Sequence, residues 1–130
     1  MPMQLPGENA VTFEQAKVRA TEYLNSEKKM RWLLSQAHRK ARRNYEFLLG
    51  PWESLQIFFR LVRAWLAGEY AASVVTVVAV AAAIIYFVEP LDLIPDPLPV
   101  LGYLDDAAVI FAVARANLNE ISRFRKWENS

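Results

Sequence analysis

Four aspartates lie close together in the second half of the chain, and they are the residues best suited to do chemistry. Residues 90 to 106 contain four Asp and no Lys or Arg. Clustered carboxylates supply the hard oxygen ligands that Ca²⁺ and Mg²⁺ prefer. The four residues are Asp92, Asp96, Asp105 and Asp106. Their spacing lacks the ordered ligand positions of an EF-hand loop, so other roles compete with metal binding.

Three interpretations of these aspartates stay open. They could bind a divalent cation, or contact a partner or a lipid headgroup. In the third interpretation they are structural, because Asp92 can form a turn and Asp105 or Asp106 can cap a helix at its positive end. We favour the structural role and expect no cofactor, with Ca²⁺ or Mg²⁺ as the alternative.

Other catalytic material is scarce. The chain has no Cys and a single histidine, His38, so it offers no thiolate nucleophile and little basis for a Ser/His pair. The four glycines are scattered and form no phosphate-binding loop. We therefore expect a protein that is not an enzyme, with His38 exposed on a helix.

Basic residues are concentrated near the amino terminus. Residues 1 to 50 carry nine basic and five acidic side chains, although the whole chain has a net charge of only +1. Such a segment could meet anionic lipid or nucleic acid, or it could be a solvated helix face. Lipid is favoured over nucleic acid, because aromatic residues are not interleaved with the charges. The candidate anionic-lipid patch consists of Lys28, Lys29, Arg39, Lys40, Arg42 and Arg43.

The elements that position these residues are predicted to be helices. A chain of 130 residues suits one domain, and apolar residues recur at helical spacing, which predicts an all-α fold of about five helices. We expect a first helix over 13–25, and a second that Ser26 caps and that runs to Leu48. Pro51 suits the first turn of a third helix, which ends before Gly68.

A run of nineteen uncharged residues, 70–88, dominates the sequence. As a helix it reaches about 28 Å, close to the thickness of about 30 Å of a bilayer's hydrocarbon core. It could span a membrane, re-enter it, or lie buried at the centre of a soluble bundle. We favour the membrane, because Trp52 and Trp65 accompany Arg60 and Arg63 in the preceding helix, a composition suited to the lipid interface.

Prolines follow the uncharged run and predict a loop. Pro90, Pro95, Pro97 and Pro99 disfavour helix, so we expect a Pro/Asp-rich loop over 89–106. A last helix should then run from Asp105 or Asp106 to about residue 125. The amino terminus shows no export signal, and basic residues precede the uncharged run, so the amino-terminal side should face the cytoplasm.

The sequence from Tyr86, YFVEPLDLIPDPLPVLGYLDDAAVI, resembles the signature of the YkvA-like family, domain of unknown function 1232. The signature residues are Tyr86, Phe87, Pro90, Asp92, Leu93, Ile94, Pro95, Asp96, Pro99, Gly102, Leu104, Asp105 and Asp106. The resemblance extends over residues 13–128, which we expect to form a single helical domain after a flexible segment 1–12. It also implies a mostly bacterial, membrane-associated family with no established activity, cofactor or catalytic residue.

These observations lead to two hypotheses of function. The first is a small membrane-associated helical protein with an adaptor or structural role, in a bacterial cell membrane or an endomembrane. Its partners would be membrane lipids, and another membrane protein or a second copy of itself. The alternative is a soluble helical domain that binds a divalent cation through the four aspartates.

Overall fold

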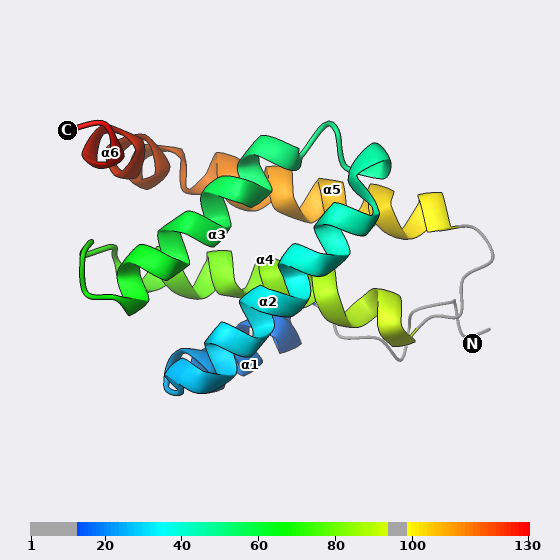
Figure 1. Ribbon diagram of the computed structural model, residues 1–130, viewed down its shortest axis with the longest axis horizontal. Helices are drawn as coiled ribbons and strands as arrows, with labels where there is room; N and C mark the ends of the chain where they lie inside the picture. The colour runs from blue at the N-terminus through cyan, green and yellow to red at the C-terminus, as the bar shows by residue number, and fades with distance from the viewer. Residues whose placement is uncertain (1–12, 94–98) are drawn as a thin grey trace.

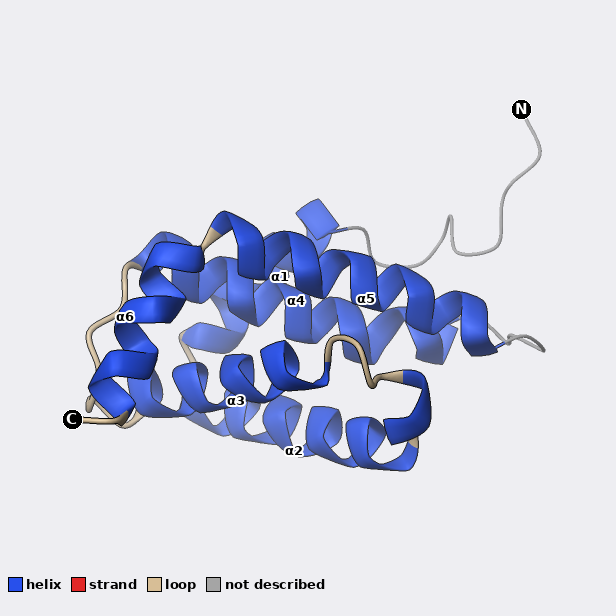
Figure 2. Ribbon diagram, turned by 90° about the horizontal axis from the view of Figure 1, so that it is seen from above, coloured by secondary structure: helices blue, strands red, loops and turns tan. Residues whose placement is uncertain are grey.

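Every regular element in the described part of the chain is a helix. The computed structural model describes residues 13–93 and 99–130, with the backbone alone for 89–93 and 99–105. The elements are α1 (Phe13–Leu24), α2 (Glu27–Arg43), the short 3₁₀ helix η1 (Tyr45–Phe47), α3 (Trp52–Leu66), α4 (Val74–Leu93), α5 (Pro99–Ala116) and α6 (Leu118–Glu128). The prediction of an all-α fold is confirmed (Figure 2).

The helices lie in two layers. Figure 2 shows α2 and α3 as one layer and α4 and α5 as a second, with α6 across one end. The central helix is α4, which packs against α1, α2, α3 and α5 (Figure 1). Its core residues are Val77, Val80, Ala81, Ala82, Ala83, Ile84, Ile85, Phe87 and Val88. A helix covered on all sides needs no polar face, which explains why the sequence there lacks one.

The interpretation of 70–88 as a membrane span is therefore not supported. In the residues that the structure describes, no helix combines the length and the apolar character that crossing a bilayer requires. The helix begins at Val74 and continues to Leu93. Of the environments considered for this run, burial at the centre of a bundle is the one found, because neighbouring helices cover its apolar surface.

The predicted loop over 89–106 is wrong at both ends. Pro90 lies in the last turn of α4, and Pro99 is the first residue of α5, where a missing N–H costs nothing. Because α5 begins at Pro99, Asp105 and Asp106 lie inside this helix and do not cap it. The predicted last helix is also divided, since Asn117 separates α5 from α6. The flexible segment 1–12 lies outside the described residues.

The ends of α2 and α3 follow local rules. Ser26 caps α2 as predicted, because its Oγ accepts a hydrogen bond of 3.2 Å from the Lys29 N–H. The helix ends at Arg43, earlier than predicted, and η1 follows. After α3, Gly68 has a φ of 74°, a conformation that a glycine adopts easily and that ends helices.

Candidate functional site

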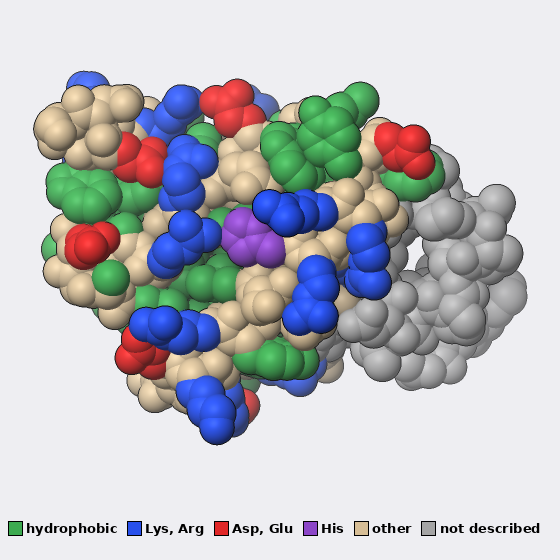
Figure 3. Space-filling view, viewed as in Figure 1, with side chains coloured by type: hydrophobic (Ala, Val, Ile, Leu, Met, Phe, Trp, Pro, Cys, Tyr) green, Lys and Arg blue, Asp and Glu red, His purple; other side chains and the backbone are tan. Residues whose placement is uncertain are grey.

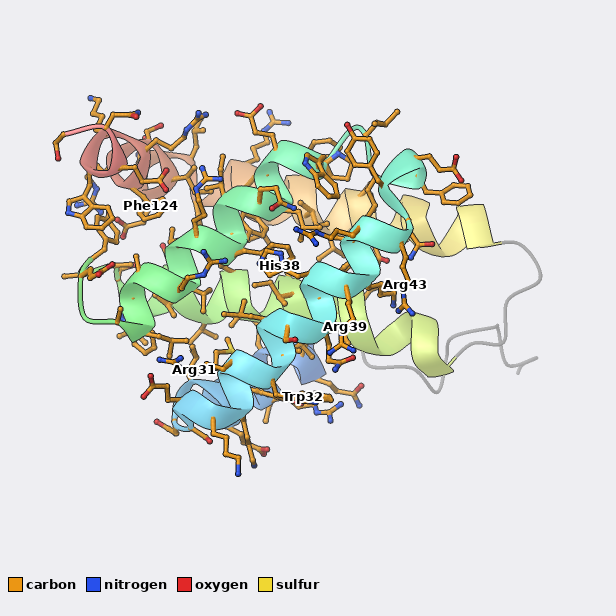
Figure 4. The ribbon with its side chains drawn as sticks, in the orientation of Figure 1. Arg31, Trp32, His38, Arg39, Arg43 and Phe124 are labelled. Carbon is orange, nitrogen blue, oxygen red and sulfur yellow. The ribbon has the colours of Figure 1, made fainter. Side chains whose placement is uncertain are left out.

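Basic side chains gather on the outer surface of the α2 and α3 layer. Figure 3 shows Lys and Arg around the one histidine of the chain on this side of the molecule. Residues 31, 35, 38 and 42 are spaced by three or four positions, so they lie on one side of α2. Figure 4 shows Arg31, His38, Arg39 and Arg43 along that helix. We call this surface the α2–α3 face; its residues are Arg31, Ser35, His38, Arg39, Arg42, Arg43 and Arg63.

His38 links the two helices of this face. The Arg63 Nη2 donates to the His38 Nε2 at 3.1 Å, and the imidazole packs on Phe59 with 4.3 Å between ring centroids. Burial lowers the pKa of His38, and the positive charges of Arg63 and Arg42 lower it further. The ring is therefore held neutral, with Nε2 as acceptor. His38 is half-buried, whereas the sequence predicted an exposed histidine.

A groove of about 420 Å³ runs between α2 and α3 beside this histidine. It combines guanidinium groups, a hydroxyl and apolar surface. The lining residues are Arg31, Leu34, Ser35, His38, Arg63, Leu66 and Ala67. Arg39 adds a hydrogen bond of 3.4 Å from its Nη2 to the Ser35 Oγ. Two separate helices thus supply the donors that meet in this groove.

An exposed apolar surface lies at the connection between α2 and α3. Tyr45, Phe47 and Leu49 are all exposed there, with Leu49 at 62%. The Tyr45 ring meets Trp52 edge to face at 4.6 Å between centroids. Exposed Phe111 of α5 lies beside this connection, because a Cβ added to Gly50 would be 3.7 Å from its Cζ. We call this surface the apolar tip; its residues are Tyr45, Phe47, Leu49, Trp52 and Phe111.

The predicted anionic-lipid patch is largely exposed, with one exception. Lys28, Lys29, Arg39, Arg42 and Arg43 are exposed on α2. Lys40 is only 8% exposed and points into the bundle. Including Lys40 in the patch was therefore wrong, because it lies on the same side of α2 as the buried Leu33 and Ala37.

The buried Lys40 ammonium contacts the end of α4. Its Nζ donates to the carbonyl oxygens of Phe87, at 2.8 Å, and Val88, at 3.0 Å. It also lies 5.3 Å from the centroid of the Phe87 ring. Pro90 has no backbone N–H to donate within α4. The Lys40 ammonium donates to two carbonyl oxygens in the same part of this helix. Lys40 is thus a structural residue that joins α2 to α4.

A second polar cluster, at the α6 end, was not predicted. The Glu120 carboxylate accepts hydrogen bonds from the Tyr70 hydroxyl at 2.8 Å and the Ser73 N–H at 3.0 Å, and it pairs with Arg123 at 2.9 Å. Burial opposes its ionisation, but these hydrogen bonds and the Arg123 charge outweigh burial and lower the pKa of Glu120. Its partners lie up to 50 residues away in the chain, so local spacing carries no signal for this cluster.

Two comparisons bear on the family of this chain. A family model described as a protein of unknown function (DUF1232) matches residues 76–112. The uncharacterized membrane protein YkvA of Bacillus subtilis (strain 168) is 41% identical over 76 residues, which are 58% of this chain and 72% of that protein. The chain belongs to the DUF1232 family. No solved structure matches this DUF1232 protein.

The DUF1232 match covers most of α4 and α5 and excludes the α2–α3 face. Tyr86, Pro90 and Asp92 lie in α4, and these two helices pack together. The signature residues in α5 are Pro99, Gly102, Leu104, Asp105 and Asp106. Asp106 is only 1% exposed, so it belongs to the interior. Pro95 and Asp96 lie outside the described residues.

Metal binding by this DUF1232 protein stays a prediction. Among the residues that the structure describes, no three or more of His, Asp and Glu are placed to hold a metal ion. That finding does not include the side chains of Asp92, Asp96 and Asp105, which lie outside the side chains that the structure describes.

Proposed function

We propose that this DUF1232 protein associates with a membrane surface as a helical bundle, with the apolar tip inserted into the interface and the α2–α3 face against anionic headgroups. The observation that carries the proposal is the exposure of Tyr45, Phe47 and Leu49 directly after Arg42 and Arg43. The relative from Bacillus subtilis, which is named a membrane protein, supports it. The role proposed is an adaptor or structural one and includes no catalytic step.

The chemistry of the two surfaces suits a lipid interface. Aromatic side chains favour the headgroup level, where an apolar ring and a polar edge are both satisfied. Each Lys or Arg near an anionic leaflet contributes about 1 kcal/mol of attraction. The cytoplasmic leaflet is the negatively charged one, so the proposal places the amino-terminal helices α1 and α2 on the cytoplasmic side. The bundle could then present other surfaces to a membrane protein or to a second copy.

Sedimentation with vesicles tests this proposal. The wild type should pellet with phosphatidylcholine vesicles that contain phosphatidylserine, and less with phosphatidylcholine alone. The variant Phe47→Gln with Leu49→Gln should bind at least about tenfold more weakly, because each apolar side chain removed from water contributes about 1.5 to 3 kcal/mol.

The matched control is Val74→Gln with Val75→Gln, which removes two even more exposed apolar side chains at the start of α4. It should bind like the wild type. Equal losses in both variants, or a wild type that stays in the supernatant with every vesicle, would contradict the proposal.

A further inference from the structure

We propose that the groove between α2 and α3 binds a phosphate group. Arg63, which lines the groove, is its main cationic contact, and Ser35 and His38 are further hydrogen-bonding groups. Arg42, one helical turn after His38 on α2, adds a second positive charge beside the groove. The assignment of that phosphate to a lipid headgroup rests on the proposed function. The proposal that the groove binds phosphate does not depend on it.

Uncompensated charge is the first argument. Arg31, Arg60, Arg123 and Arg125 each form an ion pair with a carboxylate, namely Glu27, Glu128, Glu120 and Glu53. Among the described side chains, no carboxylate forms an ion pair with Arg39, Arg42, Arg43 or Arg63. Like charges held on one surface repel each other, and a bound anion would offset that repulsion.

Preorganisation is the second argument. Arg63 is held by the His38 imidazole, which is in turn packed on Phe59, so one guanidinium edge is fixed in position. An arginine makes one bond to His38 and keeps further N–H donors, which suit the paired oxygens of a phosphate. Because the His38 Nε2 accepts a hydrogen bond from Arg63, the neutral imidazole carries its proton on Nδ1. This N–H is a further hydrogen-bond donor, in addition to the guanidinium groups. Ser35 adds a hydroxyl group to the same groove.

The lining of the groove favours a lipid phosphate over a nucleic acid. Leu34, Leu66 and Ala67 give it an apolar side, which fits the glycerol and upper acyl region of a lipid. No Trp, Tyr or Phe lines it, and the one ring that does, His38, is already packed on Phe59, so the groove lacks the large aromatic platforms on which bases stack. The apolar tip also lies next to Arg42 and Arg43 in the chain, so one docked orientation can engage both.

The single histidine provides a direct reporter. Its imidazole NMR signals have no overlap from another histidine, because His38 is the only one in the chain. Titration with inorganic phosphate at constant ionic strength should shift these signals saturably, with chloride as the comparison anion. Arg42→Gln with Arg63→Gln should weaken phosphate binding at least about tenfold. Calorimetry measures this loss, because the substitution of Arg63 also changes the surroundings of the His38 ring and therefore its NMR signals.

The control variant is Arg115→Gln with Lys126→Gln, which removes the same charge from exposed residues of α5 and α6. It should bind phosphate like the wild type. Circular dichroism of both variants shows whether each is folded. A second sedimentation experiment uses vesicles in which phosphatidic acid replaces phosphatidylserine at equal molar charge. The Arg42 and Arg63 variant should lose more binding to these vesicles than the control variant does.

The outcomes separate the two proposals. Vesicle binding without any response of His38 to phosphate, or equal losses in the variant and its control, overturns the phosphate site and leaves the proposed function standing. Phosphate binding that depends on Arg42 and Arg63 without vesicle sedimentation supports the site and contradicts the proposed function. Tighter binding of a DNA or RNA oligonucleotide than of vesicles, lost in the same variant, overturns the lipid assignment.

Discussion

The α6 end and the α2–α3 face differ in the groups that contact their arginines. At the α6 end, Arg123 pairs with Glu120 of the same helix, and Arg125 pairs with Glu53 of α3 and so joins two helices that are distant in sequence. On the α2–α3 face, the partner of Arg63 is a neutral histidine. The arginines of α6 are thus paired with carboxylates of the fold, whereas Arg39, Arg42, Arg43 and Arg63 of the α2–α3 face form no ion pair with a carboxylate among the described side chains.

The presence or absence of a carboxylate partner, more than residue type, distinguishes the polar groups that stabilise the fold from those that we propose to bind a ligand. Exposed ion pairs contribute only about 0 to 1 kcal/mol each, so the α6 end depends mainly on the buried Glu120 rather than on its surface arginines. A cluster of arginines without counter-charges contributes nothing comparable to folding. The phosphate site that we propose would account for the presence of such a cluster on one face.

The largest expected effect comes from the α6 end. Glu120→Ala should lower the free energy of unfolding by about 2 to 4 kcal/mol, because the Tyr70 hydroxyl and the Ser73 N–H lose a charged acceptor in a buried site. Chemical denaturation measures this loss. The control Glu53→Ala removes an exposed carboxylate and should change stability by less than about 0.5 kcal/mol. Similar values for the two variants would mean that Glu120 is no more structural than a surface residue.

A smaller effect is expected inside α2, where one basic residue belongs to the structural group. Lys40→Met keeps the length of the side chain but removes the donors to the Phe87 and Val88 carbonyls, which should cost about 1.5 to 3 kcal/mol. Arg43→Met, at an exposed position, should leave stability unchanged within about 0.5 kcal/mol and weaken vesicle binding instead. The comparison fails if Lys40→Met retains full stability and loses vesicle binding as Arg43→Met does.

The smallest effect concerns the pH dependence of the α2–α3 face. Because the pKa of His38 is lowered in the folded protein, the unfolded chain binds more protons as the pH falls below about 6.5. The contribution of His38 to stability is complete above that pH and decreases in acid. Melting temperatures between pH 5 and 7 should therefore fall more steeply for the wild type than for His38→Gln. Parallel curves would show that the histidine is not held neutral by its neighbours.

The sequence by itself determined the helical class, the first three helices to within a few residues, and the family. Apolar spacing, the Ser26 cap and the Pro51 start are local signals, and local signals specify helix ends. The prolines misled, because Pro90 and Pro99 are compatible with the last and first turns of two helices as well as with a loop. The basic character of α2 was also visible, although the special position of Lys40 was not.

Only the tertiary structure decided which charges are buried and where the uncharged run lies. An apolar helix has the same sequence signal in lipid and in a bundle core, and the packing of α1, α2, α3 and α5 around α4 distinguishes the two. The hydrogen bonds of Glu120 to Tyr70 and Ser73 and the contact of His38 with Arg63 join residues that are 25 to 50 positions apart in the chain. Such contacts arise from packing geometry, which residue spacing along one helix does not record.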